Sequence, residues 1–123
     1  MQESKRQKQV ARLIQEELSD IFQRLGLNIF HGGMISISQV KMTPDLLEAR
    51  IYLSFYQITD PDQMLALIKD RKWEIKKELA TRIKHQLRRI PELQFFRDDT
   101  LDYVFRLEEI FKKIHEQDKP ADE

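Results

Sequence analysis

Apolar residues recur every three or four positions over residues 4–25, which places them on one face of a helix. Ser4 and Gln7 have the spacing of a capping box at its start. Gly26 is a suitable stop, because glycine tolerates the left-handed backbone of a helix C-terminus. The predicted apolar face consists of Val10, Leu13, Ile14, Leu18, Ile21, Phe22 and Leu25. The chain therefore opens with an amphipathic helix.

The pattern changes to a period of two over residues 34–41 and 48–56, which is typical of half-buried strands. Thr43-Pro44-Asp45 supplies turn chemistry between them, and Gly32-Gly33 predicts a tight turn into the first strand. In the second segment the residues expected to face the core are Ala49, Ile51, Leu53 and Phe55. Together the two segments predict an antiparallel hairpin.

A third pattern runs over residues 61–90, which contain no glycine and no proline after Pro61. Asp60-Pro61 is a typical helix start, because Asp accepts amide hydrogen bonds at the N-cap and Pro needs no amide partner there. About 30 residues are long for one helix in a small domain, so we expect a bend or two abutting helices near residues 70–74. For Trp73 the alternatives are packing at that bend and an exposed stacking role, and packing is the one we expect.

Two further elements follow Pro91. Residues 93–97 predict a strand, with one of its two phenylalanines in the core, and Asp98-Asp99-Thr100 predicts the cap of a last helix over residues 101–116. The element order is then α-β-β-α(α)-β-α, an α+β fold with a three-stranded sheet packed by helices. The long crossover between the second and third strands allows them to run parallel. We expect one domain over residues 1–116 and a polar C-terminal tail over 117–123.

Charge is distributed unevenly along a chain whose formal net charge is zero. Residues 69–90 hold nine Lys or Arg against three acids, whereas residues 98–123 hold four against nine. A polyanion responds mainly to the charges nearest to it, because physiological salt screens electrostatic interactions over a distance of about 8 Å. Nucleic-acid binding therefore remains possible despite the neutral total.

The predicted basic helix places Lys77, Lys84 and Arg88 along one side, where they could contact successive phosphates. An equally open interpretation is a solvated helix with local ion pairs, such as Glu78 with Arg82. A second basic cluster lies at the start of the first helix. The candidate RNA-binding residues are Lys5, Arg6, Lys8, Arg12, Lys76, Lys77, Arg82, Lys84, Arg88 and Arg89.

Other chemistries find little support in the sequence. There is no cysteine, the three histidines are scattered, and Gly32-Gly33 lacks the pattern of a nucleotide-binding loop. No nucleophile, base and orienting group occur together, and no apolar run reaches the roughly 18 residues of a membrane helix. We therefore expect no metal, cofactor, small-molecule substrate, membrane contact or enzymatic activity, and a cytoplasmic location.

Three segments together resemble the ribosome-binding factor A (RbfA) family. The first is the basic start of the opening helix with the pattern Val10-Ala11, then Ile14, then Glu17-Leu18. The second is the hairpin segment over residues 35–55, Ile35-Ser36-Ile37-Ser38-Gln39-Val40-Lys41-Met42-Thr43-Pro44-Asp45-Leu46-Leu47-Glu48-Ala49-Arg50-Ile51-Tyr52-Leu53-Ser54-Phe55. The third is the strand entry over residues 87–100, Leu87-Arg88-Arg89-Ile90-Pro91-Glu92-Leu93-Gln94-Phe95-Phe96-Arg97-Asp98-Asp99-Thr100. The resemblance spans nearly the whole chain.

This resemblance implies a KH-like fold of the type II order, with a helix pair between the second and third strands. It also implies binding to the free small (30S) ribosomal subunit and its 16S rRNA, a role in late rRNA processing and subunit maturation, and no catalytic site. We expect a monomer off the ribosome. The alternative is a protein–protein adaptor whose basic helix docks an acidic partner. Two family features are absent: a glycine at the helix bend, and an Asp-Pro-Arg sequence where Asn28-Ile29-Phe30-His31 stands.

Overall fold

The computed structural model describes residues 3–30, 32–98, 110, 112 and 114. Its first element, α1, spans Lys5–Arg24 and carries the predicted capping box. The Ser4 hydroxyl accepts a hydrogen bond from the backbone amide of Gln7, and the Gln7 side-chain oxygen accepts one from the backbone amide of Ser4. Gly26 has φ +71°, so the predicted helix stop is confirmed. The predicted last helix (101–116) and tail (117–123) lie outside the described residues, except for residues 110, 112 and 114, which are helical.

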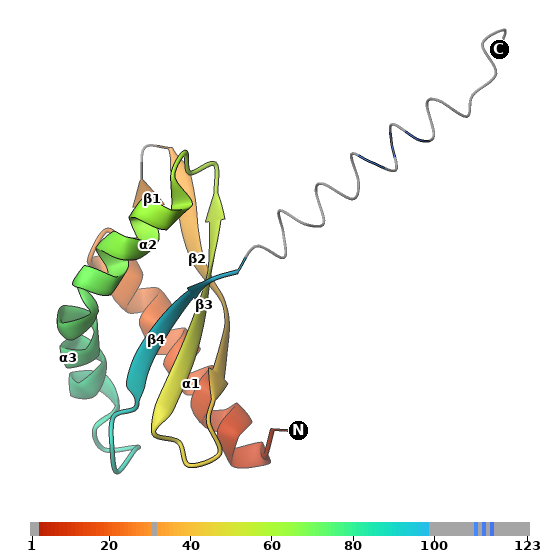
Figure 1. The fold of residues 1–123 in the computed structure, drawn as a ribbon. Helices are drawn as coiled ribbons and strands as arrows, with labels where there is room; N and C mark the ends of the chain where they lie inside the picture. Colours follow the sequence, from red (N-terminus) through yellow and green to blue (C-terminus); the bar gives the residue numbers. More distant parts are fainter. Residues whose placement is uncertain (1–2, 31, 99–109, 111, 113, 115–123) are drawn as a thin grey trace, which may run out of the picture.

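Four strands form one sheet in the order β1-β2-β3-β4: Ile29–Phe30, Gly33–Met42, Glu48–Tyr56 and Glu92–Arg97 (Figure 1). The sequence predicted three strands, and the fourth is the two-residue β1. Gly32, at φ +81°, turns the chain so that Phe30 pairs with Gly33. A strand of two exposed residues carries no detectable periodicity, which is why the hydrophobic pattern missed it.

The predicted hairpin is confirmed, because β2 and β3 pair antiparallel, with one register shift between Ile37 and Gln39. β4 pairs with β3 in parallel, in the register Ile51 with Phe95. The loop between β2 and β3 and the entry into β4 therefore meet at one end of the sheet. That end is where the candidate site forms.

The predicted bend between helices is also confirmed. α2 spans Pro61–Asp70 and α3 spans Lys72–Ile83, and Arg71 is the junction between them. Two related predictions are wrong. Trp73 does not pack at the bend, since its side chain is 73% exposed. The helix also does not continue to residue 90: the amides of Gln86 and Leu87 both donate to the Ile83 carbonyl, and the chain turns there.

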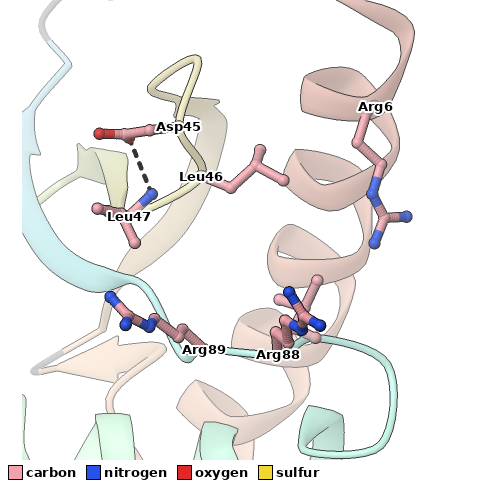
Figure 2. Close-up of a pocket in the computed structure, with 7 residues that line it drawn as sticks. Arg6, Asp45, Leu46, Leu47, Arg88 and Arg89 are labelled. Atoms are coloured by element: carbon pink, nitrogen blue, oxygen red, sulfur yellow. Dashed lines mark hydrogen bonds between the residues drawn. The ribbon is translucent and has the colours of Figure 1, made fainter.

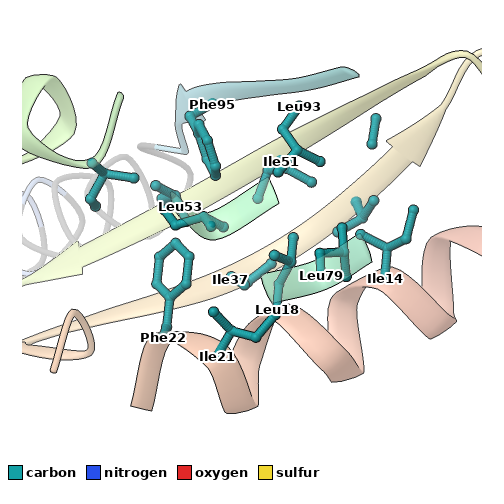
Figure 3. Close-up of a cluster of buried hydrophobic side chains, with 14 of the residues drawn as sticks. Ile14, Leu18, Ile21, Phe22, Ile37, Ile51, Leu53, Leu79, Leu93 and Phe95 are labelled. Atoms are coloured by element: carbon teal, nitrogen blue, oxygen red, sulfur yellow. The ribbon is translucent and has the colours of Figure 1, made fainter. Parts of the chain in front are cut away.

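The hydrophobic core lies between helices α1, α2 and α3 and one face of the sheet (Figures 1 and 3). α1 supplies Ile14 and Leu18, and α3 supplies Leu79, all fully buried. The opposing strands supply the predicted inward row of β3, with Ala49, Ile51 and Leu53 fully buried and Phe55 partly buried. Phe95 is the buried phenylalanine of β4, as expected, while Phe96 faces outward and stacks on Tyr52.

We expect Leu79→Ala to lower the free energy of unfolding by about 2–5 kcal/mol, because it removes buried methyl groups and leaves a cavity between α1, α3 and the sheet. Leu67→Ala in α2 is the matched control, since Leu67 is 45% exposed, and should cost less than about 1 kcal/mol. Urea unfolding followed by circular dichroism measures both. Similar losses for the two variants would contradict this packing.

Candidate nucleic-acid interface

A hollow of about 630 Å³ lies where the start of α1, the β2–β3 loop and the segment between α3 and β4 come together (Figure 2). We call it the basic hollow. Its lining combines three arginines, three leucines and one carboxylate: Arg6, Arg88, Arg89, Leu46, Leu47, Leu87 and Asp45. Two segments that the sequence treated as separate basic clusters, at residues 5–12 and 76–89, therefore share one site.

The β2–β3 loop forms a rigid wall of the basic hollow. The Thr43 hydroxyl donates to Asp45 Oδ1 (2.6 Å), and the Leu47 amide donates to the same oxygen (3.1 Å). Both hydrogen bonds lower the pKa of Asp45, the one from Thr43 more strongly, so this carboxylate is ionised at neutral pH. Leu46 has φ +62°, an unfavourable backbone for a leucine, and its side chain packs against the core.

The same loop is joined to the opposite wall by the backbone. The Glu92 amide donates to the Leu47 carbonyl (2.8 Å), which continues the parallel pairing of β3 and β4. Leu87 is buried beneath the segment that carries Arg88 and Arg89. The positions of the two arginines therefore follow from a buried leucine before them and a paired strand after them.

Seven of the ten candidate cations are exposed, with no ion pair to any residue in the described part of the chain. These are Lys5, Arg6, Lys8, Lys77, Lys84, Arg88 and Arg89. Arg6, Arg88 and Arg89 line the basic hollow, and Lys5 and Lys8 lie on the first turns of α1 beside Arg6. Because α3 ends at Ile83, Lys84 and Arg88 do not continue the helix face of Lys77 as the sequence predicted.

Arg82 is held by acids of the fold. Its side chain is 17% exposed, and its guanidinium contacts Glu17 and Asp20 of α1 and Glu78 of its own helix. The hydrogen bond to Asp20 is the main cause that raises the Arg82 pKa. Arg82 therefore joins α3 to α1, and its predicted role in RNA binding remains a prediction that the geometry does not favour.

Lys76 also has an acidic partner within the fold. Together with Lys72 it bridges to Glu92 at the start of β4, each ammonium lying 2.8 Å from a carboxylate oxygen. These two lysines, Lys72 first, lower the pKa of Glu92 to about 2. Arg12 pairs with Glu16 one helical turn away at an exposed site, which contributes little to stability. Lys77 lies 5.2 Å from the centre of the Trp73 ring, a cation–π contact at the surface.

The sequence did not predict four residues of the basic hollow: Asp45, Leu46, Leu47 and Leu87. Asp45 was assigned to a turn, and the leucines carry no charge signal. The hairpin and strand-entry segments that resemble RbfA contain all four, but no single-residue pattern marks them as a site. Their proximity depends on the parallel pairing of β3 and β4.

Within the described residues, no group of three or more His, Asp or Glu is placed to hold a metal ion. Over these same residues no helix has the length and apolar character that crossing a membrane requires. His85 is exposed. The site therefore presents guanidinium groups, leucine side chains and one carboxylate.

The fold is that of a KH-like α+β domain, and its basic surface lies at the end of the sheet where β4 begins. The family model described as ribosome-binding factor A matches residues 6–111. The chain belongs to the ribosome-binding factor A family. Its membership confirms the resemblance found in the three sequence segments.

Curated relatives with this family name are similar over most of the chain. The ribosome-binding factor A of Cytophaga hutchinsonii is 42% identical over 112 residues, covering 91% of this chain and 84% of the relative. That of Christiangramia forsetii is 38% identical over 113 residues, covering 91% and 86%. Among solved structures, a putative ribosome-binding factor A of Thermotoga maritima superposes with a TM-score of 0.66 at 21% identity, covering 81% of this chain and 93% of the other. This structural likeness supports the fold.

We expect Glu92→Gln to lower stability at neutral pH by about 1 kcal/mol or less, because the Lys72–Glu92–Lys76 bridge is exposed. The lowered pKa of Glu92 means that the bridge contributes fully above about pH 4.5 and is lost as pH falls toward about 2. Urea unfolding at pH 7, 5 and 3 should show the difference between parent and variant shrinking with acid. A difference that stays constant would contradict the bridge.

We expect Arg82→Gln to lower the free energy of unfolding by about 1–3 kcal/mol, because Glu17 and Asp20 lose a charged hydrogen-bond donor and Glu78 loses an ion-pair partner. Arg88→Gln is the matched control, since Arg88 is exposed and has no ion pair in the described part of the chain, and it should leave stability within about 0.5 kcal/mol. Thermal and urea unfolding measure both. Equal stability of the two variants would show that Arg82 does not join the helices.

Proposed function

We propose that this protein binds the free small ribosomal subunit through 16S rRNA and assists late rRNA processing and subunit maturation. It does so in the cytoplasm as a monomer, by binding and holding rRNA and without catalysing a reaction. One observation carries the proposal: six cations of α1 and of segment 84–89 have no carboxylate partners among the described residues, and three of them line one hollow. A homology model of the Thermus thermophilus ribosome-binding factor A, with a TM-score of 0.57 at 18% identity to this chain, has been fitted into the cryo-EM map of a 30S–RbfA complex.

The physical basis is local electrostatics. The acids within the described part of the fold are largely taken up by other cations: Glu92 by Lys72 and Lys76, and Glu17 and Asp20 by Arg82. The unpaired cations around the basic hollow are therefore available to RNA phosphates, whose binding releases condensed counterions. Because RNA-binding proteins recognise rRNA largely by its shape and its unpaired nucleotides, a KH-like domain needs no helix that reads base pairs in a groove.

Reversal of Lys84, Arg88 and Arg89 to Glu should reduce affinity for purified free small subunits on the order of 100-fold, because three phosphate contacts become repulsive. The dependence of log affinity on log salt should also become shallower by about 3, near one per lost contact. Co-sedimentation over a range of salt concentrations measures both quantities, and circular dichroism confirms that the variant is folded.

The matched control reverses Lys41, Arg50 and Lys69 to Glu. These three cations are exposed, lie on β2, β3 and α2, and give the same change in net charge. The control should bind small subunits within about threefold of the parent, since none of the proposed RNA contacts is lost and salt screens the effect of charges far from the RNA. If both triple variants lose affinity equally, binding follows net charge and the proposed face is wrong.

A further inference from the structure

The basic hollow has a property that phosphate binding alone does not require, namely its apolar lining. Exposed cations on a convex surface are sufficient to contact the phosphates of a helix. Here leucine side chains line a hollow of about 630 Å³, within the range of about 300–1,000 Å³ of pockets that hold small organic molecules. Leu47, at the rim of the hollow, is 45% exposed, whereas Leu87, at its base, is only 9% exposed. A group that fills this space has an apolar surface as well as charge.

The charges around the hollow are also asymmetric. Asp45 lies on the β2–β3 loop, and the guanidinium groups of Arg6 and Arg88 come from α1 and from the segment before β4 (Figure 2). The Oδ1 oxygen of Asp45 accepts from Thr43 and Leu47. A carboxylate here repels a phosphate and favours an N–H donor. The complementary ligand therefore combines an anionic group for the arginines, an N–H donor for Asp45 and an apolar plane.

We infer that the basic hollow takes one unpaired nucleotide of the bound RNA, with its base against Leu47 and Leu87 and its phosphates on Arg6, Arg88 and Arg89. A nucleobase has the required apolar faces and N–H groups on its edge, and guanidinium planes stack on such faces. This inference rests on the proposed function, and it adds that the RNA offers a base removed from pairing. It assigns a role to Leu47 and Asp45, which phosphate binding leaves without one.

The hollow is formed before any ligand binds. The two hydrogen bonds to Asp45 and the bond from the Glu92 amide to the Leu47 carbonyl fix the loop. Leu46 holds φ +62°, a conformation unfavourable for leucine, because its side chain is anchored in the core. A wall that is already ordered loses little conformational entropy when a base enters.

The test compares two RNA hairpins of about ten base pairs, identical except that one carries a single unpaired nucleotide, using the full chain and fluorescence anisotropy. The parent should bind the bulged hairpin about tenfold more tightly than the fully paired one. Leu47→Ser should abolish this preference without changing the salt dependence, because it removes apolar contact and no charge. Leu47→Met is the matched control and should retain the preference, since methionine keeps the apolar surface.

Arg88→Gln should behave differently from Leu47→Ser. It should weaken binding of both hairpins and make the salt dependence shallower by about 1, as expected for one lost phosphate contact. Equal affinity of the parent for the two hairpins, or an unchanged preference in Leu47→Ser, would overturn the inference. So would binding of free nucleoside monophosphates as tight as that of the bulged hairpin, because the site would then hold a free nucleotide instead of RNA.

Binding to small subunits separates failure of this inference from failure of the proposed function. If Arg88→Gln weakens subunit binding but the parent does not prefer the bulged hairpin, the rRNA-binding face stands and the nucleotide site is wrong. If the parent does not bind free small subunits at all, the proposed function itself is wrong. Leu47 and Arg88 are both exposed, so we expect each variant to remain folded. Thermal unfolding of each variant checks that a loss of binding does not reflect a loss of fold.

Discussion

The packing of α1 and α3 against one face of the sheet is the constraint on which the rest of the structure depends. Ile14, Leu18 and Leu79 lose all contact with water against Ile51 and Leu53, and burial of such side chains contributes about 1.5–3 kcal/mol each. This packing fixes the start of α1 beside the β2–β3 loop and brings the chain back parallel to β3. The basic hollow lies at the end of the sheet where the start of α1, the β2–β3 loop and the segment between α3 and β4 meet.

Polar contacts then divide the cations into two groups with different roles. Arg82 joins α3 to α1 through Glu17 and Asp20, and Lys72 and Lys76 join α3 to β4 through Glu92. These ion pairs leave the cations of segment 84–89 and of the first turns of α1 without acidic partners in the described part of the chain. A chain of zero net charge thereby presents a locally basic surface, because its acids are used where helices and strands join.

Much of the fold was predictable because it is recorded in local periodicity. The capping box of Ser4 and Gln7, the stop at Gly26 and the alternation in β3 follow from short-range chemistry, whereas the bend at Arg71 was expected from the length of the helical segment. The errors have local causes too. β1 is too short to show a period, and the helix after Lys72 ends early because the Ile83 carbonyl takes two amides in a turn that the apolar spacing of residues 83, 87 and 90 did not reveal.

The sequence by itself determined the types of the longer described elements, the family and the set of cations from which a binding face could be drawn, since each depends on residue identity and near-neighbour spacing. Only the tertiary structure decided which of those cations are available. Lys76 and Arg82 have acidic partners 16 and 62 residues away along the chain, and Arg6 meets Arg88 across a hollow whose leucines carry no charge signal. Long-range pairing sets these contacts, and a linear pattern does not encode the distance between residues brought together by folding.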